Sequence, residues 1–268
     1  MVSEQDINDA KKLGYTVDVP SDLAAKQIND HFPGLELMTL LAGIETLLDA
    51  HTEKPANKRI VIDAAPAPYF QILYLSNNYA DEDRGLTMSR YFEYENSRLI
   101  VYHHYLVIPK STRGQGLGTK VMALWFDQYV NMGVKEIRVH AGLKDGGAVW
   151  AKVGFKATDK IEMENILQSA RTILAGTEEL QDVEAIFNNY YQKEPDGKAF
   201  PIEDWANIDA MLPVLKLDTK SVRKIEKIYN TIHFVILNVV KNLLRLLSMR
   251  YTFHREVLVK KILRYRSE

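Results

Sequence analysis

The sequence Arg113-Gly114-Gln115-Gly116-Leu117-Gly118 is a glycine-rich turn between a predicted strand and a predicted helix. The apolar residues 98–108 before the turn favour a strand, and residues 119–126 after it favour a helix. Glycines let backbone N–H groups approach a ligand closely, and the start of a helix adds partial positive charge. This order of elements therefore predicts a binding site for phosphate groups.

The positions of the glycines exclude two common phosphate-binding motifs. The Walker loop, G-x-x-x-x-G-K-S/T, requires a Lys-Ser/Thr pair that is missing here. The dinucleotide motif G-x-G-x-x-G requires a third glycine after Gly116 and Gly118, and an acidic residue at the end of the next strand, where residues 139–142 offer none. The turn matches R/Q-x-x-G-x-G/A, with Arg113 first. The alternative is a glycine-rich turn that binds no ligand.

The turn and its surroundings resemble the GNAT superfamily of acyl-CoA-dependent N-acetyltransferases. In that family a strand ending V-x-P precedes the loop, and here the strand ends Val107-Ile108-Pro109. A helix to about Met132-Gly133, a strand at 136–141 and the stretch 146–155 follow in the family's order. That stretch, G-G-A-V-W-A-K-V-G-F, is similar to the family's A-x-x-Y-x-K-x-G-F element. The resemblance covers roughly residues 59–160.

The resemblance implies an α+β fold with a twisted, mostly antiparallel sheet flanked by helices, with extra helices at both ends of the chain. The central strands are expected to splay at the phosphate loop. It also implies direct transfer of an acetyl group from acetyl-CoA to an amine, in a ternary complex and without a metal. The coenzyme contacts that it implies are Val107, Ile108, Arg113, Gly114, Gln115, Gly116, Leu117, Gly118, Thr119 and Lys152.

The sequence departs from the family pattern at two places. One extra residue stands between Pro109 and Arg113. Trp150 also stands where many members carry a tyrosine, whose hydroxyl protonates the departing CoA thiolate. An indole N–H donates a hydrogen bond but does not give up its proton. We therefore expect Trp150 to pack on the pantetheine arm of the coenzyme.

The strand before the loop offers candidates for a general base. Strand alternation places His103 and Tyr105 on the same face and His104 on the other. His103 stands ten residues before Arg113, which is about where the carboxylate base of some family members lies. A neutral histidine suits this role, because its ordinary pKa is near 6.5. His103, with Tyr105 beside it, is the predicted catalytic group. The alternative is that both histidines only pack in an aromatic strand.

Two acidic residues on the preceding strand, Glu93 and Glu95, are weaker candidates for the base, and a solvated strand edge explains them equally well. The acceptor itself has no signature in the sequence. Residues 1–213 carry a net charge of −10, which favours cationic acceptors by simple electrostatics.

Composition is that of a globular protein of 268 residues, with 46% hydrophobic and 26% charged residues. There is no cysteine, which excludes disulfides, thiolate metal sites and an acyl-cysteine intermediate. The histidines are scattered, so we expect no metal, and no nucleic-acid signature is present. The polar first thirty residues and the lack of a long apolar run predict a cytoplasmic protein without a membrane span.

The chain divides into four predicted regions: helices at 1–57, an acetyl-CoA-binding core at 58–160, a helical extension packed on the core at 161–213, and a basic amphipathic helical tail at 214–268. The tail has a net charge of +9, opposite in sign to the rest. We expect its apolar helices to pack on the core or in a homodimer. The alternative is a peripheral membrane or protein-partner contact by residues 232–265.

Two functions from different classes follow from the sequence. The first is an N-acetyltransferase. The second is a non-catalytic module with the same fold that binds CoA, or a protein or membrane partner, through its helical extensions.

Overall fold

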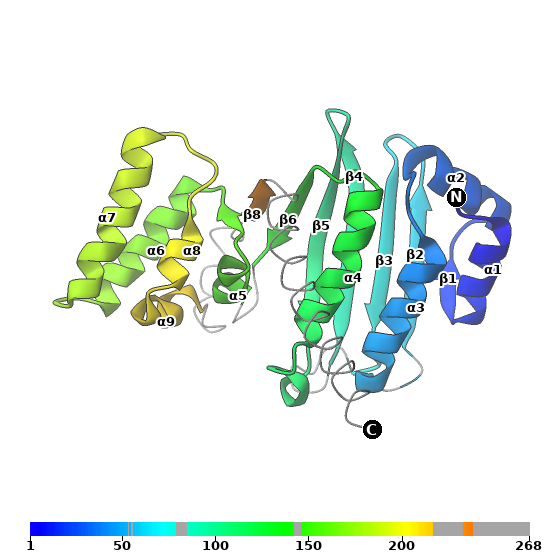
Figure 1. Ribbon diagram of the computed structural model, residues 1–268, viewed down its shortest axis with the longest axis horizontal. Coiled ribbons are helices and arrows are strands. Elements are labelled where there is room, and N and C mark those ends of the chain that lie inside the picture. Colours follow the sequence, from blue (N-terminus) through cyan, green and yellow to red (C-terminus); the bar gives the residue numbers. More distant parts are fainter. Residues whose placement is uncertain (53, 55, 79–84, 142–145, 217–232, 238–268) are drawn as a thin grey trace, which may run out of the picture.

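A mixed sheet of eight strands forms the centre of the computed structural model, which describes residues 1–52, 54, 56–78, 85–141, 146–216 and 233–237 (Figure 1). The strand order is β1-β2-β3-β4-β5-β6-β8-β7. The strands are β1 (Tyr15–Val17), β2 (Asn57–Asp63), β3 (Tyr69–Leu75), β4 (Thr87–Glu95), β5 (Arg98–Val107), β6 (Glu136–His140), β7 (Lys156–Ala157) and β8 (His233–Leu237).

Helices flank the sheet, as predicted. In the described part of the chain they are α1 (Glu4–Lys12), α2 (Ser21–His31), α3 (Leu37–Leu48), α4 (Leu117–Asn131), α5 (Gly146–Lys152), α6 (Lys160–Ile173), α7 (Glu178–Lys193), α8 (Ile202–Ala206) and α9 (Leu212–Leu215). Short 3-10 turns are η1 (Asp49–His51), η2 (Lys110–Thr112) and η3 (Asp209–Met211). Helices α3 and α4 lie side by side over one face of the sheet (Figure 1).

The pairing of the strands is mostly antiparallel. Strands β2 to β5 form an antiparallel meander, and β8 pairs in antiparallel fashion with both β6 and β7. Strand β5 pairs in parallel with β6, because α4 carries the chain back across the sheet between them. The predicted mixture of a mainly antiparallel sheet with flanking helices is therefore confirmed.

Helix α4 anchors this arrangement through its aromatic side. Trp125 and Tyr129 are fully buried, and both rings contact Phe92 of β4. The indole N–H of Trp125 also lies 3.3 Å from the sulfur of Met88. The first turn of α4 is consequently fixed at the end of β5.

The N-terminal region contains the expected helices and one unexpected strand. Helix α1 begins at a capping box, in which the Ser3 and Asp6 side chains each accept from the other residue's backbone N–H. Strand β1 pairs in parallel with β2 over three residues only. A strand of this length has no recognisable alternation in sequence, so it was missed.

The C-terminal helices gather around a second aromatic cluster beside the end of the sheet. Phe200 and Trp205 are fully buried, and their rings contact Phe187 of α7. The indole of Trp205 donates to the backbone oxygen of Val183 at 3.0 Å. These contacts pack α7 and α8 together.

The prediction of a helical tail at 214–268 is wrong at residues 233–237, because His233–Leu237 forms strand β8. Its sequence His-Phe-Val-Ile-Leu is aromatic and β-branched, which suits a strand, and β6 and β7 both offer it hydrogen-bonding edges. Residues 238–268, on which the predictions of a homodimer and of a membrane or partner contact rest, lie outside the described residues. Across the described part of the chain, no helix is long and apolar enough to cross a membrane.

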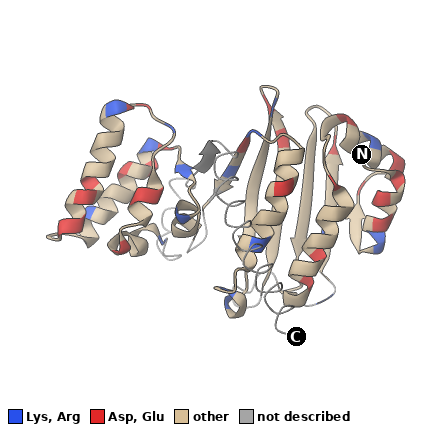
Figure 2. Ribbon diagram, viewed as in Figure 1, with Lys and Arg blue, Asp and Glu red and all other residues tan. Residues whose placement is uncertain are grey.

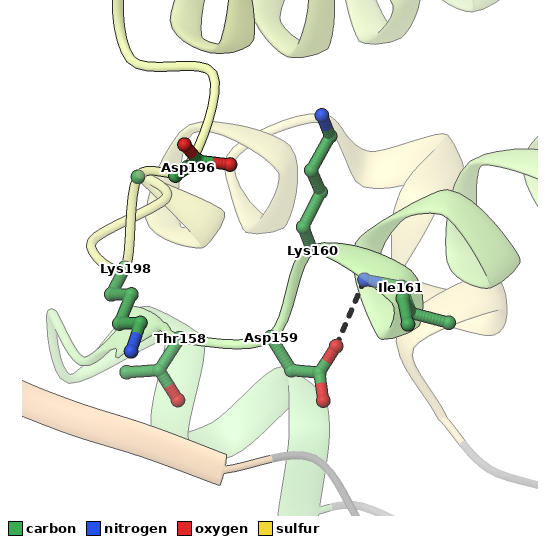
Figure 3. Close-up of a pocket in the computed structure, with 7 residues that line it drawn as sticks. Thr158, Asp159, Lys160, Ile161, Asp196 and Lys198 are labelled. Atoms are coloured by element: carbon green, nitrogen blue, oxygen red, sulfur yellow. Dashed lines mark hydrogen bonds between the residues drawn. The ribbon is translucent and has the colours of Figure 1, made fainter.

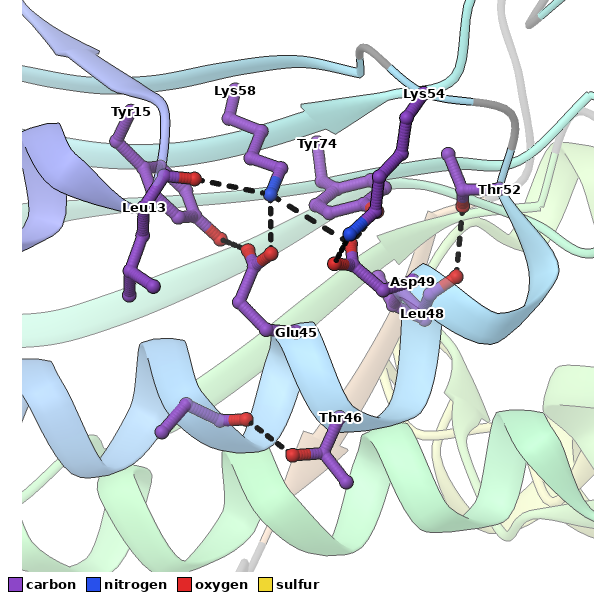
Figure 4. Close-up of polar contacts among 11 residues, drawn as sticks. Leu13, Tyr15, Glu45, Thr46, Leu48, Asp49, Thr52, Lys54, Lys58 and Tyr74 are labelled. Carbon is purple, nitrogen blue, oxygen red and sulfur yellow. Dashed lines mark hydrogen bonds and ion pairs between the residues drawn. The ribbon is translucent and has the colours of Figure 1, made fainter.

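A buried ion network fastens α3 to the edge of the sheet (Figure 4). The Lys58 ammonium of β2 pairs with Glu45, lies 3.7 Å from Asp49, and sits over the rings of Tyr15 and Tyr74. Tyr15 donates to Glu45 at 2.9 Å, and Tyr74 donates to Asp49 at 2.7 Å. Burial raises the pKa of both tyrosines, so both hydroxyls remain donors.

Replacing Lys58 by methionine should destabilise the protein by about 3–5 kcal/mol, because the side chain is only 8% exposed and its loss leaves two carboxylates without their buried cation. Urea unfolding at pH 7 measures this. The matched control is Lys54→Met, since Lys54 also pairs with Asp49 but is 64% exposed, and a much smaller loss of stability is expected because solvent screens an exposed pair. Equal midpoints for the two variants would contradict the role of Lys58.

Candidate functional site

The glycine-rich turn joins the end of β5 to the start of α4, as the sequence predicted. Gly114 and Gly116 have φ angles of 78° and 75°, a left-handed conformation that favours glycine. Gly116 is the N-cap of α4, and no side chain caps the helix there. The first N–H groups of a helix have no partner within it, so a bound anion can accept hydrogen bonds from them. Residues 114–116 are exposed and leave this end accessible.

The turn is held in place by its own side chains. The guanidinium of Arg113 donates through Nε to the backbone oxygen of Ile108 at 2.9 Å, and Gln115 donates to the oxygen of Ser111 at 3.1 Å. Basic residues surround the turn, on η2 and on the first turns of α4, whereas acidic residues are frequent on the N-terminal helices (Figure 2). These basic residues are Lys110, Arg113 and Lys120, and all three are exposed.

Strand β5 leaves its parallel neighbour halfway along its length. The pairing with β6 runs from Ile100 opposite Glu136 to His103 opposite Val139 and stops there. Residues 104–107 continue β5 while pairing only with β4 among the described strands. This end of pairing agrees with the expected splay of the central strands. Among the described strands, residues 104–107 therefore have an edge without a partner on the β6 side, about 13 Å long at 3.3 Å per residue, which leads to the turn and is called the free edge below.

The expectation that His103 and Tyr105 share a face is wrong. The register between β4 and β5 shifts: Ser89 lies opposite Tyr105, but Arg90 lies opposite His103, so His104 is an extra residue in β5. Such a bulge interrupts the alternation of side chains along a strand. Tyr105 is accordingly 54% exposed, whereas His103 is 2% exposed.

His103 points into the layer between the sheet and α4. Its Nε2 lies 2.7 Å from the hydroxyl of Tyr129, and its Nδ1 is buried without a hydrogen-bond partner. Burial, together with the nearby positive charge of Arg90, holds the pKa of His103 well below 6.5. The imidazole is therefore neutral at physiological pH. A buried ring nitrogen without a protein partner is uncommon, so this position calls for an explanation, such as a bound water or a role in the site.

Arg90, which lies opposite His103 on β4, is a residue of the candidate site that the sequence pattern did not single out. It is fully buried, and its Nη1 donates to the backbone oxygens of Ser89 and Tyr105, each at 2.9 Å. Ser89 and Tyr105 lie opposite each other on the two strands, next to the register shift. Desolvation lowers the pKa of Arg90 from its ordinary value. The signal was an arginine in the otherwise uncharged first part of β4, Thr87-Met88-Ser89-Arg90-Tyr91-Phe92.

The structure brings Trp150 and His103 together, although 47 residues separate them in the sequence. The two rings meet edge to face, with centroids 5.8 Å apart, and Trp150 also contacts Phe155 at 5.2 Å. Trp150 is half-buried on α5. Lys152 of the same helix is exposed, and among the described residues no hydrogen bond or ion pair joins it to the turn.

An open hollow elsewhere on the surface is not a candidate site. It lies where α6 begins and where α7 turns towards α8 (Figure 3). Two of its charged groups already have structural roles. Asp159 accepts from the backbone N–H of Ile161 at 2.8 Å and caps α6, while Lys160 donates to the oxygen of Pro195 and lies over the ring of Tyr191. The hollow shares no residue with the glycine-rich turn.

Within the described residues, no group of three or more histidine, aspartate or glutamate side chains is placed to hold a metal ion. Comparison of the chain with protein-family models and with curated proteins finds no match.

The buried position of His103 predicts a pH dependence of stability. Because the pKa of His103 is lower in the folded state than in the unfolded state, only the unfolded chain gains a proton as the pH first falls below 6.5. His103 should therefore reduce the free energy of unfolding by up to about 1.4 kcal/mol per pH unit in that range. Urea unfolding at pH 7, 6 and 5 should show a shallower dependence for His103→Gln than for the wild type. Identical slopes would mean that His103 titrates normally.

Proposed function

We propose that this protein is an N-acetyltransferase that moves an acetyl group from acetyl-CoA to an amine. The observation that carries the proposal is the exposed turn with Gly114 and Gly116 at positive φ, placed between a strand with a free edge and an uncapped helix start. That combination suits a ligand with phosphates at one end and a long thin arm at the other. Acetyl-CoA, which the sequence resemblance to acyl-CoA-dependent enzymes implies, is such a ligand.

In this proposal the pyrophosphate of CoA accepts hydrogen bonds from the backbone of residues 114–119, with Lys110, Arg113 and Lys120 adding positive charge. The pantetheine arm follows the free edge of β5 over residues 104–107. Its thioester then lies near His103 and Trp150, where the pairing of β5 with β6 ends.

Transfer requires an amine with a free lone pair beside the thioester. The nitrogen attacks the carbonyl carbon, the C–S bond breaks, and the sulfur leaves as the CoA thiolate, which takes up a proton. The enzyme contributes by holding the reacting atoms about 3–3.5 Å apart and by removing a proton from the amine. Trp150 supplies an apolar wall and one N–H donor, but no acidic proton.

The alternative is a non-catalytic module that binds CoA or a partner. Two observations favour it: Trp150 occupies the position where the resembling family carries its acid, and His103 is only 2% exposed. Thiol release from acetyl-CoA in the presence of a panel of amines separates the two functions, because a module binds the coenzyme without consuming it.

Substituting Gly116 by valine should abolish acetyl-CoA binding, because a side chain at φ 75° strains the turn and covers the N–H groups that bind phosphate. Isothermal titration calorimetry measures the affinity. The matched control is Gly176→Val, since Gly176 has a φ of 82° and equally open surroundings but lies between α6 and α7. Its backbone strain is comparable and its acetyl-CoA affinity should be unchanged. Normal binding by the Gly116 variant would refute the phosphate site.

Exchanging Trp150 for tyrosine tests the role of the aromatic wall. Tyrosine keeps the contact with His103 and adds a hydroxyl that can protonate a thiolate, so coenzyme affinity should hold and turnover should stay equal or rise. Trp150→Ala should weaken acetyl-CoA binding by roughly 1–3 kcal/mol through lost apolar contact. A tyrosine variant that binds acetyl-CoA but does not turn over would assign a specific role to the indole N–H.

A further inference from the structure

The face of β4 and β5 that points away from α4 carries a cluster of aromatic side chains. Met88, Arg90 and Phe92 contact α4, so Tyr91 and Glu93, which alternate with them, project from the opposite face. Tyr91 and Glu93 are partly exposed there. This surface is therefore reached from the side of the sheet opposite to α4.

His104 lies flat on this surface. Its ring is stacked on Tyr91 with centroids 5.5 Å apart and an interplanar angle of 9°, and Tyr102 contacts both rings at 5.9 and 6.0 Å. Stacking uses the faces of the imidazole and leaves its edge, with the two nitrogens, open. His104 is exposed, and among the described residues no side chain forms a hydrogen bond with it.

Glu93 supplies a negative charge beside the aromatic rings. Its carboxylate accepts from the Tyr91 hydroxyl at 3.0 Å, and no basic side chain of the described residues pairs with it. The nearby Glu95 differs, because Arg138 binds it through two contacts of 2.5 and 2.8 Å and holds its pKa below the ordinary value. A carboxylate without a cation, next to aromatic faces, favours an ammonium group.

We propose that this surface is the acceptor site, that the acceptor is a small aliphatic diamine, and that His104 takes the proton from the amine that reacts. The inference rests on the proposed acetyl transfer. Glu93 binds one ammonium group with Tyr91 and Tyr102 beside it. The other amine lies at His104, which follows the last pair between β5 and β6 and so stands at the free edge assigned to the coenzyme.

The spacing supports a diamine. Tyr91, on which His104 is stacked, and Glu93 are two residues apart on β4, which corresponds to about 7 Å along the strand. Extended 1,5-diaminopentane has about this length. An amine with an uncharged chain would leave Glu93 without its cation and gain less from the site.

His104 is suited to accept a proton. Partial burial and the charge of Arg90 lower its pKa, although Glu93 acts in the opposite direction, so the imidazole is neutral when the acceptor arrives. The reacting ammonium gives one proton to His104, which passes it to solvent. The freed lone pair forms the N–C bond, the C–S bond breaks, and the second proton of that nitrogen goes to the thiolate. The products are the acetylated diamine and CoA.

The test uses the full chain, with 1,5-diaminopentane and pentylamine as acceptors and acetyl-CoA as donor. For the wild type, KM for the diamine should be at least about tenfold lower than for pentylamine. Glu93→Gln should remove this preference with little change in kcat, and Glu93→Asp should retain part of it. His104→Gln should lower kcat about tenfold or more for both amines, with KM and acetyl-CoA affinity unchanged. The control is Glu179→Gln, which removes an exposed carboxylate on α7, far from Glu93 in the sequence.

Equal KM values for the two amines in the wild type, or an unchanged preference in Glu93→Gln, would overturn the diamine assignment, and an unchanged kcat in His104→Gln would overturn the proton acceptor. Calorimetry with 1,5-diaminopentane alone separates this inference from the proposed function. Binding that depends on Glu93 in a protein that does not bind acetyl-CoA would retain the amine site and reject the acetyltransferase. Binding of acetyl-CoA without binding or acetylation of the diamine would retain the coenzyme site and reject the diamine site.

Discussion

The clamp that Arg90 makes between β4 and β5, through hydrogen bonds to one backbone oxygen of each strand beside their register shift, is the constraint on which the candidate site depends. A fully buried guanidinium is costly, and the described residues give it no carboxylate partner, so its hydrogen bonds to two backbone oxygens must offset much of that cost. Ser89 and Tyr105 lie opposite each other on the two strands, directly next to the shift. The clamp thus stabilises the bulge at His104, after which β5 no longer pairs with β6.

The bulge also explains which parts of the structure could be predicted from the sequence. Strands β5 and β6 lie within one residue of the predicted strands at 98–108 and 136–141, and α4 ends within two residues of the predicted Met132-Gly133, because turns and apolar periodicity are local signals. The faces of β5 beyond His103 could not be predicted, because a single extra residue exchanges them and leaves the strand pattern intact. Strand β8 was missed because it depends on edges offered by strands distant in sequence.

The candidate site likewise has features that could be predicted from the sequence and features that could not. The turn at Gly114 and Gly116 was predictable, since a left-handed conformation at the start of a helix requires glycine wherever the rest of the chain lies. The arrangement of His103, Tyr129 and Trp150 was not, because it is set by the packing of α4 and α5 on the sheet. Two adjacent histidines were visible in the sequence; which of them is buried was decided by the three-dimensional structure.

In the proposed reaction, a continuous sheet would be an obstacle. The coenzyme turn leads into α4 on one side of the sheet, whereas His104, Tyr91 and Glu93 lie on the other. Reacting atoms must approach to about 3–3.5 Å, so donor and acceptor must meet where the sheet is interrupted. The edge of β5 after His103 is such a place. The bulge would therefore serve catalysis twice, by opening the edge and by turning His104 towards the acceptor.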